Sequence, residues 1–142
     1  MENTMLSNLK KILFRQDGQG HLRTPKDETA EFLVRHHDLD VGHLRLRDGK
    51  WHFEYTDTFR KKKDAYPIIN FPHLDKHYES DALWPFFLIR IPGLGQPAIK
   101  RMISEENIDP SNEAQLLKRF GKTTIANPFT LIPIDPPAEP EE

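Results

Sequence analysis

Cysteine is absent from the 142-residue sequence. This absence excludes a disulfide scaffold, a zinc site with thiolate ligands and a cysteine nucleophile. It is typical of proteins from the reducing cytosol, where disulfides are rare, so we expect a cytoplasmic protein.

Long hydrophobic runs are also missing. No run approaches the ~18 to 20 residues that a membrane-spanning helix needs. The apolar stretch near the N-terminus is interrupted by Lys10 and Lys11, so it lacks the continuous hydrophobic region of a signal peptide. We therefore expect no membrane partner.

A large excess of one charge is lacking too, since 20 basic and 22 acidic side chains give a net charge of −2. The two ends nevertheless differ from the middle, and the division predicts three parts. Residues 1–29 form an N-terminal extension with a short amphipathic helix and a linker, residues 30–134 form one folded domain, and residues 135–142 form a disordered, acidic, proline-rich tail.

Strand patterns begin at Ala30 and continue through residues 41–47 and 51–56, where apolar side chains alternate with polar ones. Asp48-Gly49 separates the last two segments and predicts a type I′ hairpin turn, which requires positive φ at both central residues. The alternation places Trp51, Phe53 and Tyr55 on one face of the sheet.

Helical patterns follow in the second half. Ser80 is a candidate N-cap for a helix over residues 81–91. Pro97 is a candidate first residue of a second helix, which extends to about residue 107. Asp109-Pro110 is the candidate start of a third helix, which ends at Gly121. Residues 129–134 read as a returning strand.

This order predicts an α+β domain in which three N-terminal strands and one C-terminal strand form a small antiparallel sheet, with about three helices on one side. The predicted core consists of Phe32, Val34, Leu44, Leu46, Trp51, Phe53, Tyr55, Phe86, Phe87, Leu117, Phe120 and Leu131.

The segment from Leu83 to Ile91 is apolar nearly all round, whereas a helix needs an apolar stripe of only about 100° to cover a core. Two interpretations stay open: the sheet and neighbouring helices bury both sides, or part of the segment contacts a partner. For the second interpretation we expect the partner-binding residues to be Trp84 and Leu94, with Pro92 and Gly93 forming the turn between them.

Other clusters of functional residue types are weaker. Metal binding by His36, His43 and His52 would require the strands to bring them together in one register. Asp38 and Asp40 flank a turn without a nucleophile, and the basic run 60–63 is typical of a solvated loop rather than a nucleic-acid surface. We therefore predict no catalytic residue, metal, cofactor or nucleic-acid partner.

Several short motifs, in this order and spacing, resemble the N-terminal subdomain of HipA-type toxin kinases over roughly residues 30–134. They are Val41-Gly42-His43-Leu44, Gly49, Phe53-Glu54-Tyr55, Ser80-Asp81-Ala82, Phe86-Phe87, Pro92, Leu116-Leu117, Phe120-Gly121 and Phe129-Thr130-Leu131-Ile132-Pro133.

The resemblance implies a link to Ser/Thr kinases that phosphorylate a translation component and belong to toxin–antitoxin operons. The sequence has no glycine-rich phosphate loop followed by a lysine and no His-x-Asp catalytic loop, so we expect a protein that is not an enzyme. In split relatives this subdomain is a separate small antitoxin called HipS, and the length of the chain fits that arrangement.

The implied partner is a HipA-like kinase encoded nearby, with a helix-turn-helix DNA-binding antitoxin as a further component of such operons. The alternative is a scaffold or adaptor that has the same fold and no toxin partner. The loop over residues 93–97 departs from the family's turn, which matches only at Pro92, and the N-terminal extension and acidic tail are further departures.

Overall fold

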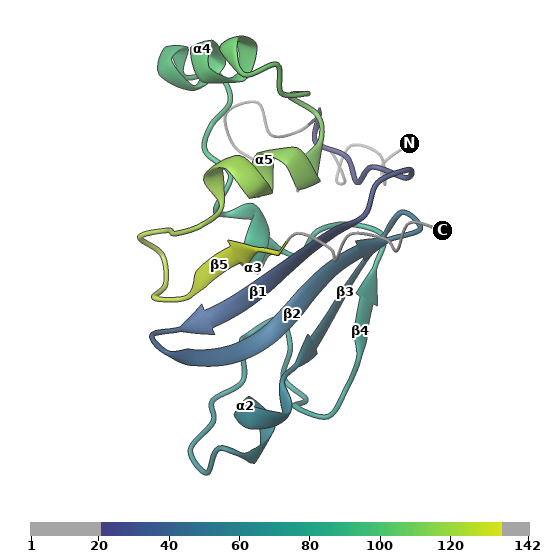
Figure 1. Ribbon diagram of the computed structural model, residues 1–142, viewed down its shortest axis with the longest axis vertical. Helices are drawn as coiled ribbons and strands as arrows, with labels where there is room; N and C mark the ends of the chain where they lie inside the picture. Colours follow the sequence, from purple (N-terminus) through teal and green to yellow (C-terminus); the bar gives the residue numbers. More distant parts are fainter. Residues whose placement is uncertain (1–20, 135–142) are drawn as a thin grey trace, which may run out of the picture.

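The computed structural model describes residues 21–134 (Figure 1). The amphipathic helix predicted in the N-terminal extension and the tail predicted over residues 135–142 lie outside these described residues.

The described residues form one antiparallel sheet of five strands in the order β4-β3-β2-β1-β5. The α+β class, the three consecutive N-terminal strands and the returning C-terminal strand are confirmed. The sequence prediction lacked β4, which pairs with β3. The strands are β1 (Ala30–His36), β2 (Leu39–Arg47), β3 (Lys50–Tyr55), β4 (Tyr78–Ser80) and β5 (Thr130–Pro133).

Two tight turns connect the first three strands. Asp48 and Gly49 have φ angles of 52° and 74°, so both adopt the positive φ that a type I′ turn requires. The turn between β1 and β2 falls at His37 and Asp38, one residue earlier than the sequence suggested, and His37 has a φ of 57°.

Gly42 lies next to a bulge in β2 and directly beneath the ring of Phe53. Val34 pairs with Gly42 but Arg35 pairs with Asp40, so Val41 is an extra residue on β2. A Cβ atom on Gly42 would lie 2.5 Å from Phe53 Cζ and 3.0 Å from the carbonyl oxygen of Glu54. The phenylalanine ring therefore packs directly over the glycine backbone.

Ten of the twelve predicted core residues are buried in the structure. Phe53 stands at the centre, with its ring stacked on Phe71 at a centroid distance of 4.0 Å and edge-on to Tyr55 at 5.1 Å. The two exceptions are Phe86 and Phe120, which are only partly buried and pack on the margin of the core.

Within residues 21–134, four helices accompany the sheet: α2 (Asp57–Lys61), α3 (Pro85–Leu88), α4 (Pro97–Glu105) and α5 (Glu113–Phe120). Figure 1 shows α4 and α5 beyond one end of the sheet and α2 at the other. Pro97 begins α4 as predicted, and the Gly121 N–H donates to the Leu117 carbonyl at the end of α5. The start expected at Asp109-Pro110 is wrong, because Asn112 caps α5.

The helix predicted over residues 81–91 is also wrong in its length. Ser80 ends β4, and its hydroxyl forms a local turn with the backbone of Ala82. Pro85 disfavours helical backbone in the residue before it, and Trp84 is extended, with φ −69° and ψ 151°. The helix therefore begins at Pro85 and spans only four residues.

Residues 21–29, predicted as a linker, pack onto the domain instead. Leu22 is in the core, the Arg23 N–H donates to the Ser111 carbonyl (2.8 Å), and the Glu113 N–H donates to the Arg23 carbonyl (3.2 Å). The buried Trp51 indole N–H lies 3.2 Å from both Thr24 Oγ1 and Glu113 Oε1. These bonds tie the segment, the sheet and α5 together.

Candidate partner-binding surface

The residues predicted to bind a partner lie along the chain between α3 and α4. Trp84 precedes α3, whereas Pro92, Gly93 and Leu94 belong to the loop that leads into α4. The structure separates them by burial: Trp84, Pro92 and Gly93 are partly buried, and Leu94 is 6% exposed.

The expectation that Leu94 is exposed before association is wrong. Its side chain belongs to the core and forms one wall of a groove, because the loop folds back toward α4. In the sequence, Leu94 lies between two glycines in a turn that is bounded by Pro92 and Pro97, and this turn was the predicted partner surface. The packing of α4 reverses that assignment.

Trp84 packs against the core with one side and remains partly exposed. Its ring meets Phe71 edge-on at a centroid distance of 4.8 Å and lies 6.5 Å from Phe87. The indole therefore supports the fold with its buried side, and contact of its exposed side with a partner stays a prediction.

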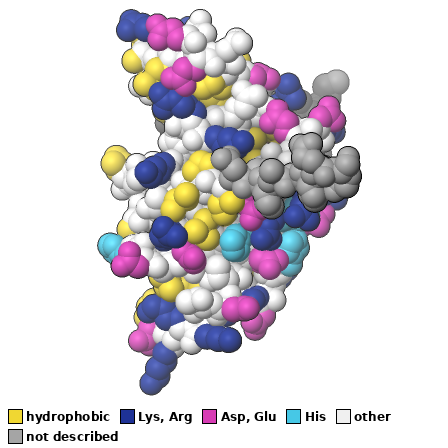
Figure 2. All heavy atoms as spheres, in the orientation of Figure 1, with side chains coloured by type: hydrophobic (Ala, Val, Ile, Leu, Met, Phe, Trp, Pro, Cys, Tyr) yellow, Lys and Arg dark blue, Asp and Glu magenta, His cyan; other side chains and the backbone are white. Residues whose placement is uncertain are grey.

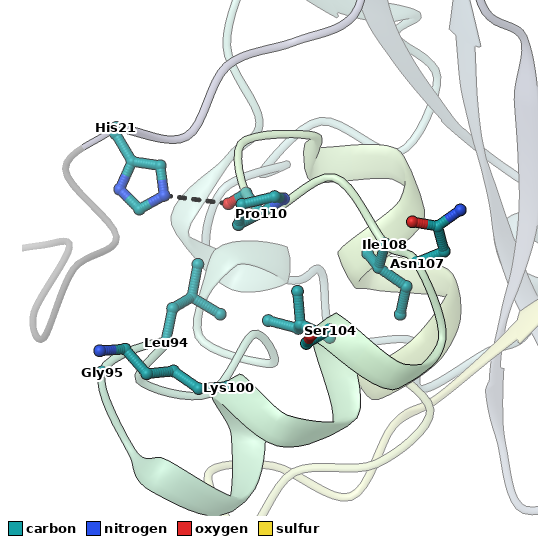
Figure 3. Close-up of a pocket in the computed structure, with 9 residues that line it drawn as sticks. His21, Leu94, Gly95, Lys100, Ser104, Asn107, Ile108 and Pro110 are labelled. Carbon is teal, nitrogen blue, oxygen red and sulfur yellow. Dashed lines mark hydrogen bonds between the residues drawn. The ribbon is translucent and has the colours of Figure 1, made fainter.

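A groove of about 530 Å³ opens beside Leu94 (Figure 3). Its apolar walls come from Leu94, Ile103, Ile108 and Pro110, and its polar rim from His21, Lys100, Ser104 and Asn107. Figure 3 shows Leu94 and Ser104 on facing sides, with His21 above Pro110. The groove thus combines an apolar floor with polar groups at its mouth, which is the usual composition of a binding site.

Two parts of the chain that are far apart in sequence hold this groove open. The His21 Nε2 atom lies 3.0 Å from the Pro110 carbonyl oxygen, which joins the N-terminal segment to the turn before α5. Asp109 accepts hydrogen bonds from the backbone and hydroxyl of Ser111, and these bonds lower the pKa of its carboxyl. The turn is therefore fixed on both sides.

Arg90, which follows α3, is buried and holds the segment between α5 and β5 in place. It is 4% exposed, and its guanidinium donates to the carbonyl oxygens of Gly121, Lys122 and Phe129 and to Asn127 Oδ1 at 2.8–3.2 Å. Burial lowers the pKa of Arg90 to about 10, which leaves it charged at neutral pH. The sequence analysis missed this role because Arg90 lies within an apolar segment.

The exposed apolar side chains are different from the ones predicted. Within the 83–91 segment, Ile89 is 56% exposed and Pro85 is also exposed, whereas Leu83, Phe87, Leu88 and Ile91 are buried. Among the described residues, Tyr66, Ile69 and Ile125 are also highly exposed large hydrophobic side chains. The strand and helix patterns gave no signal for these three, because they lie in loops.

The groove residues on α4 were likewise absent from the predicted partner surface. A useful signal was present, since Pro97 begins a short helix directly after the loop that carries Leu94. A helix in that position brings side chains one turn apart, such as Lys100 and Ser104, to the same side as the loop.

The three histidines considered for metal binding do not come together. His36 packs against Phe129 with a ring centroid distance of 5.3 Å, and His43 Nδ1 faces a Glu31 carboxylate oxygen at 3.7 Å. His52 instead meets His77. Asp38 and Asp40 do not act as a carboxylate pair in the structure, because Asp40 forms an ion pair with Arg35 at 2.9 Å.

The basic run 60–63 lies at the end of α2 and beyond it, on the surface. Arg60 pairs with Asp57 within the same helix. Among the described residues, no helix is long and apolar enough to cross a bilayer.

Together, these features define a small α+β domain with an apolar groove between its N-terminal segment, α4 and the loop before α4. A family model described as HipA N-terminal domain matches residues 32–126, which cover the sheet from β1 to β4 and all four helices. The chain belongs to the HipA N-terminal domain family. No curated protein sequence matches it.

Proposed function

We propose that this chain is a non-catalytic protein-binding module that docks onto a separate HipA-like Ser/Thr kinase. In this proposal it is the antitoxin or regulatory subunit of a split toxin–antitoxin system and acts in the cytoplasm. The observation that carries the proposal is the apolar groove at the loop that contains Leu94.

Membership in the HipA N-terminal domain family supports a HipA-like partner. A chain that carries this subdomain separately would occupy the N-terminal position on a kinase that lacks its own copy. The alternative, a scaffold or adaptor without a toxin, uses the same fold and differs in its partner.

The chemistry of the groove favours binding over catalysis. Leu94, Ile103 and Ile108 offer an apolar floor for a hydrophobic side chain of the kinase. Lys100 at the rim suits an acidic or carbonyl group beside that side chain. The described residues of the lining include no carboxylate and no paired nucleophile and base, the groups that general acid–base or nucleophilic catalysis needs.

A matched pair of variants on α4 tests the groove. Ser104 and Glu105 are adjacent and exposed, but only Ser104 lines the groove. Ser104→Trp fills the groove from its edge, whereas Glu105→Trp adds the same side chain outside it. Leu94→Asp is unsuitable, because it would place a charge in the core.

The measurement is a calorimetric titration of the full chain with the HipA-like kinase encoded beside it. We expect Ser104→Trp to weaken binding at least tenfold, or about 1.4 kcal/mol, and Glu105→Trp to bind like wild type, with equal melting curves for both. Equal affinity of the two variants would exclude the groove as the docking site. Absence of any binding by wild type would reject the kinase partner and favour the scaffold alternative.

A further inference from the structure

A compact group of histidine and glutamate side chains lies on the solvent-facing side of the sheet, where β3 pairs with β4. His52 and Glu79 are direct partners in the strand register, so their side chains stand next to each other on one face. His77 lies two residues before Glu79 and therefore projects to the same side. Figure 2 shows this face of the sheet with histidine, acidic and basic side chains mixed over its lower part.

The donor atoms of these three residues are close enough to share one ion. His52 Nδ1 lies 3.0 Å from His77 Nε2 and 4.0 Å from Glu79 Oε1, and all three ligand atoms lie within 4.8 Å of one another. Ligand atoms of a tetrahedral zinc ion are roughly 3.3 Å apart, because each stands about 2.0–2.1 Å from the metal. The two nitrogens thus need to move by only tenths of an ångström, and a rotation of the exposed Glu79 side chain supplies the remainder.

A fourth residue orients the ligands. His77 Nδ1 lies 3.0 Å from Glu54 Oε1. A proton on His77 Nδ1 directed at this carboxylate leaves the Nε2 lone pair facing His52. Metal-bound histidines are commonly held this way, by a carboxylate on the nitrogen that does not bind the metal.

The carboxylate of Glu79 is also positioned. Lys50 Nζ donates a hydrogen bond to Glu79 Oε2 at 3.0 Å. The other oxygen, Oε1, is the one that faces His52. Lys50 therefore holds one carboxylate oxygen and leaves the other for the ion.

We propose that His52, His77 and Glu79 bind a divalent zinc ion, with Glu54 positioning His77. Two imidazole nitrogens and one carboxylate oxygen are a usual protein ligand set for zinc, and a water molecule on the exposed side completes the tetrahedron. His52 keeps its proton by moving it from Nδ1 to Nε2. The ion would join β4, a three-residue edge strand, to β3.

The test is a titration of the full chain, freed of metal with a chelator, with Zn²⁺ by calorimetry and with Co²⁺ by visible absorption. We expect saturation at one ion per chain and Co²⁺ bands typical of tetrahedral coordination. His77→Ala should weaken binding at least tenfold, and Glu54→Gln by roughly tenfold or more, as expected for a residue that orients a ligand.

His73→Ala is the matched control. His73 is an exposed histidine in the loop before β4 and lies outside the group, so this variant should bind zinc like wild type. Melting curves in chelator show whether each variant is folded. Equal zinc affinity of wild type and the folded His52→Ala/His77→Ala variant, or no zinc binding by wild type, would overturn the proposal. Neither result bears on the kinase partner, because the groove shares no residue with this site.

Discussion

The two faces of the sheet hold very different side chains although they are made from the same strands. One face carries Phe32, Leu44 and Phe53, which are fully buried, and the other carries His43, Arg45 and Glu54, which are partly exposed and charged or polar. Burial organises the first face and ion pairs organise the second. Most of the favourable free energy of folding in the sheet therefore comes from the apolar face. The side chains of the polar face contribute little to stability and can serve as ligands or binding groups.

The largest effect should follow from Phe53→Ala on the apolar face. Phe53 is fully buried and contacts Phe71, Tyr55 and Phe87, so the change leaves a large cavity. We expect a loss of about 3–5 kcal/mol of unfolding free energy, measured by urea denaturation. A midpoint equal to that of wild type would show that this face does not dominate stability.

Gly42→Ala should follow with a loss of about 1–3 kcal/mol, because the added methyl group meets a ring and a backbone oxygen that are both fixed in the core. Denaturation of Gly95→Ala is the control, since a Cβ there meets nothing within 4 Å. Equal losses in the two variants would mean that β2 can shift away from Phe53.

Tyr55→Phe tests the polar atom buried on the apolar face. The hydroxyl donates to the Phe71 carbonyl (2.6 Å) and accepts from the Ile68 N–H (2.8 Å), so its removal should cost about 1–3 kcal/mol. Burial raises the pKa of Tyr55 to about 12, compared with about 10 in an unfolded chain.

The effect of Tyr55→Phe on stability should also depend on pH. A raised folded-state pKa means that the contribution of Tyr55 is complete below pH ~10 and is lost as the pH rises through about 12. The stability difference between wild type and Tyr55→Phe should therefore shrink over this interval. A stability difference that stays constant over this pH interval would show that folding does not raise the pKa of Tyr55.

The smallest effect belongs to the polar face. In the presence of chelator, His52→Ala should change the unfolding free energy by less than about 0.5 kcal/mol, because the residue lies on the solvent side of β3. A loss of unfolding free energy as large as that of Tyr55→Phe would show that the polar face contributes as much to stability as the apolar face.

The sequence was sufficient to predict the apolar face, because strand alternation has a period of two and places Trp51, Phe53 and Tyr55 together. It also predicted the turn at Asp48-Gly49, where local geometry alone determines the residue types. These features depend on neighbours along the chain.

The candidate sites could not be predicted in the same way. The groove depends on how the loop with Leu94 folds against α4 and on the contact between His21 and Pro110, which are 89 residues apart. The histidine pair depends on β4, a three-residue strand without a recognisable pattern. Pro85 was a local signal that was overlooked, since it restricts Trp84 and shortens the helix.

The buried Arg90 has a consequence for how the sheet ends. It holds the carbonyl groups of Gly121, Lys122 and Phe129, and thereby the segment that runs along the outer side of β5. The outward N–H groups of β5 alternate: Leu131 donates to the Lys122 carbonyl, and Pro133 has no N–H to donate. An edge strand with free donors is a template for pairing with another chain, and this one offers none at either position. Arg90 therefore helps to close the β5 edge of the sheet to pairing with another molecule.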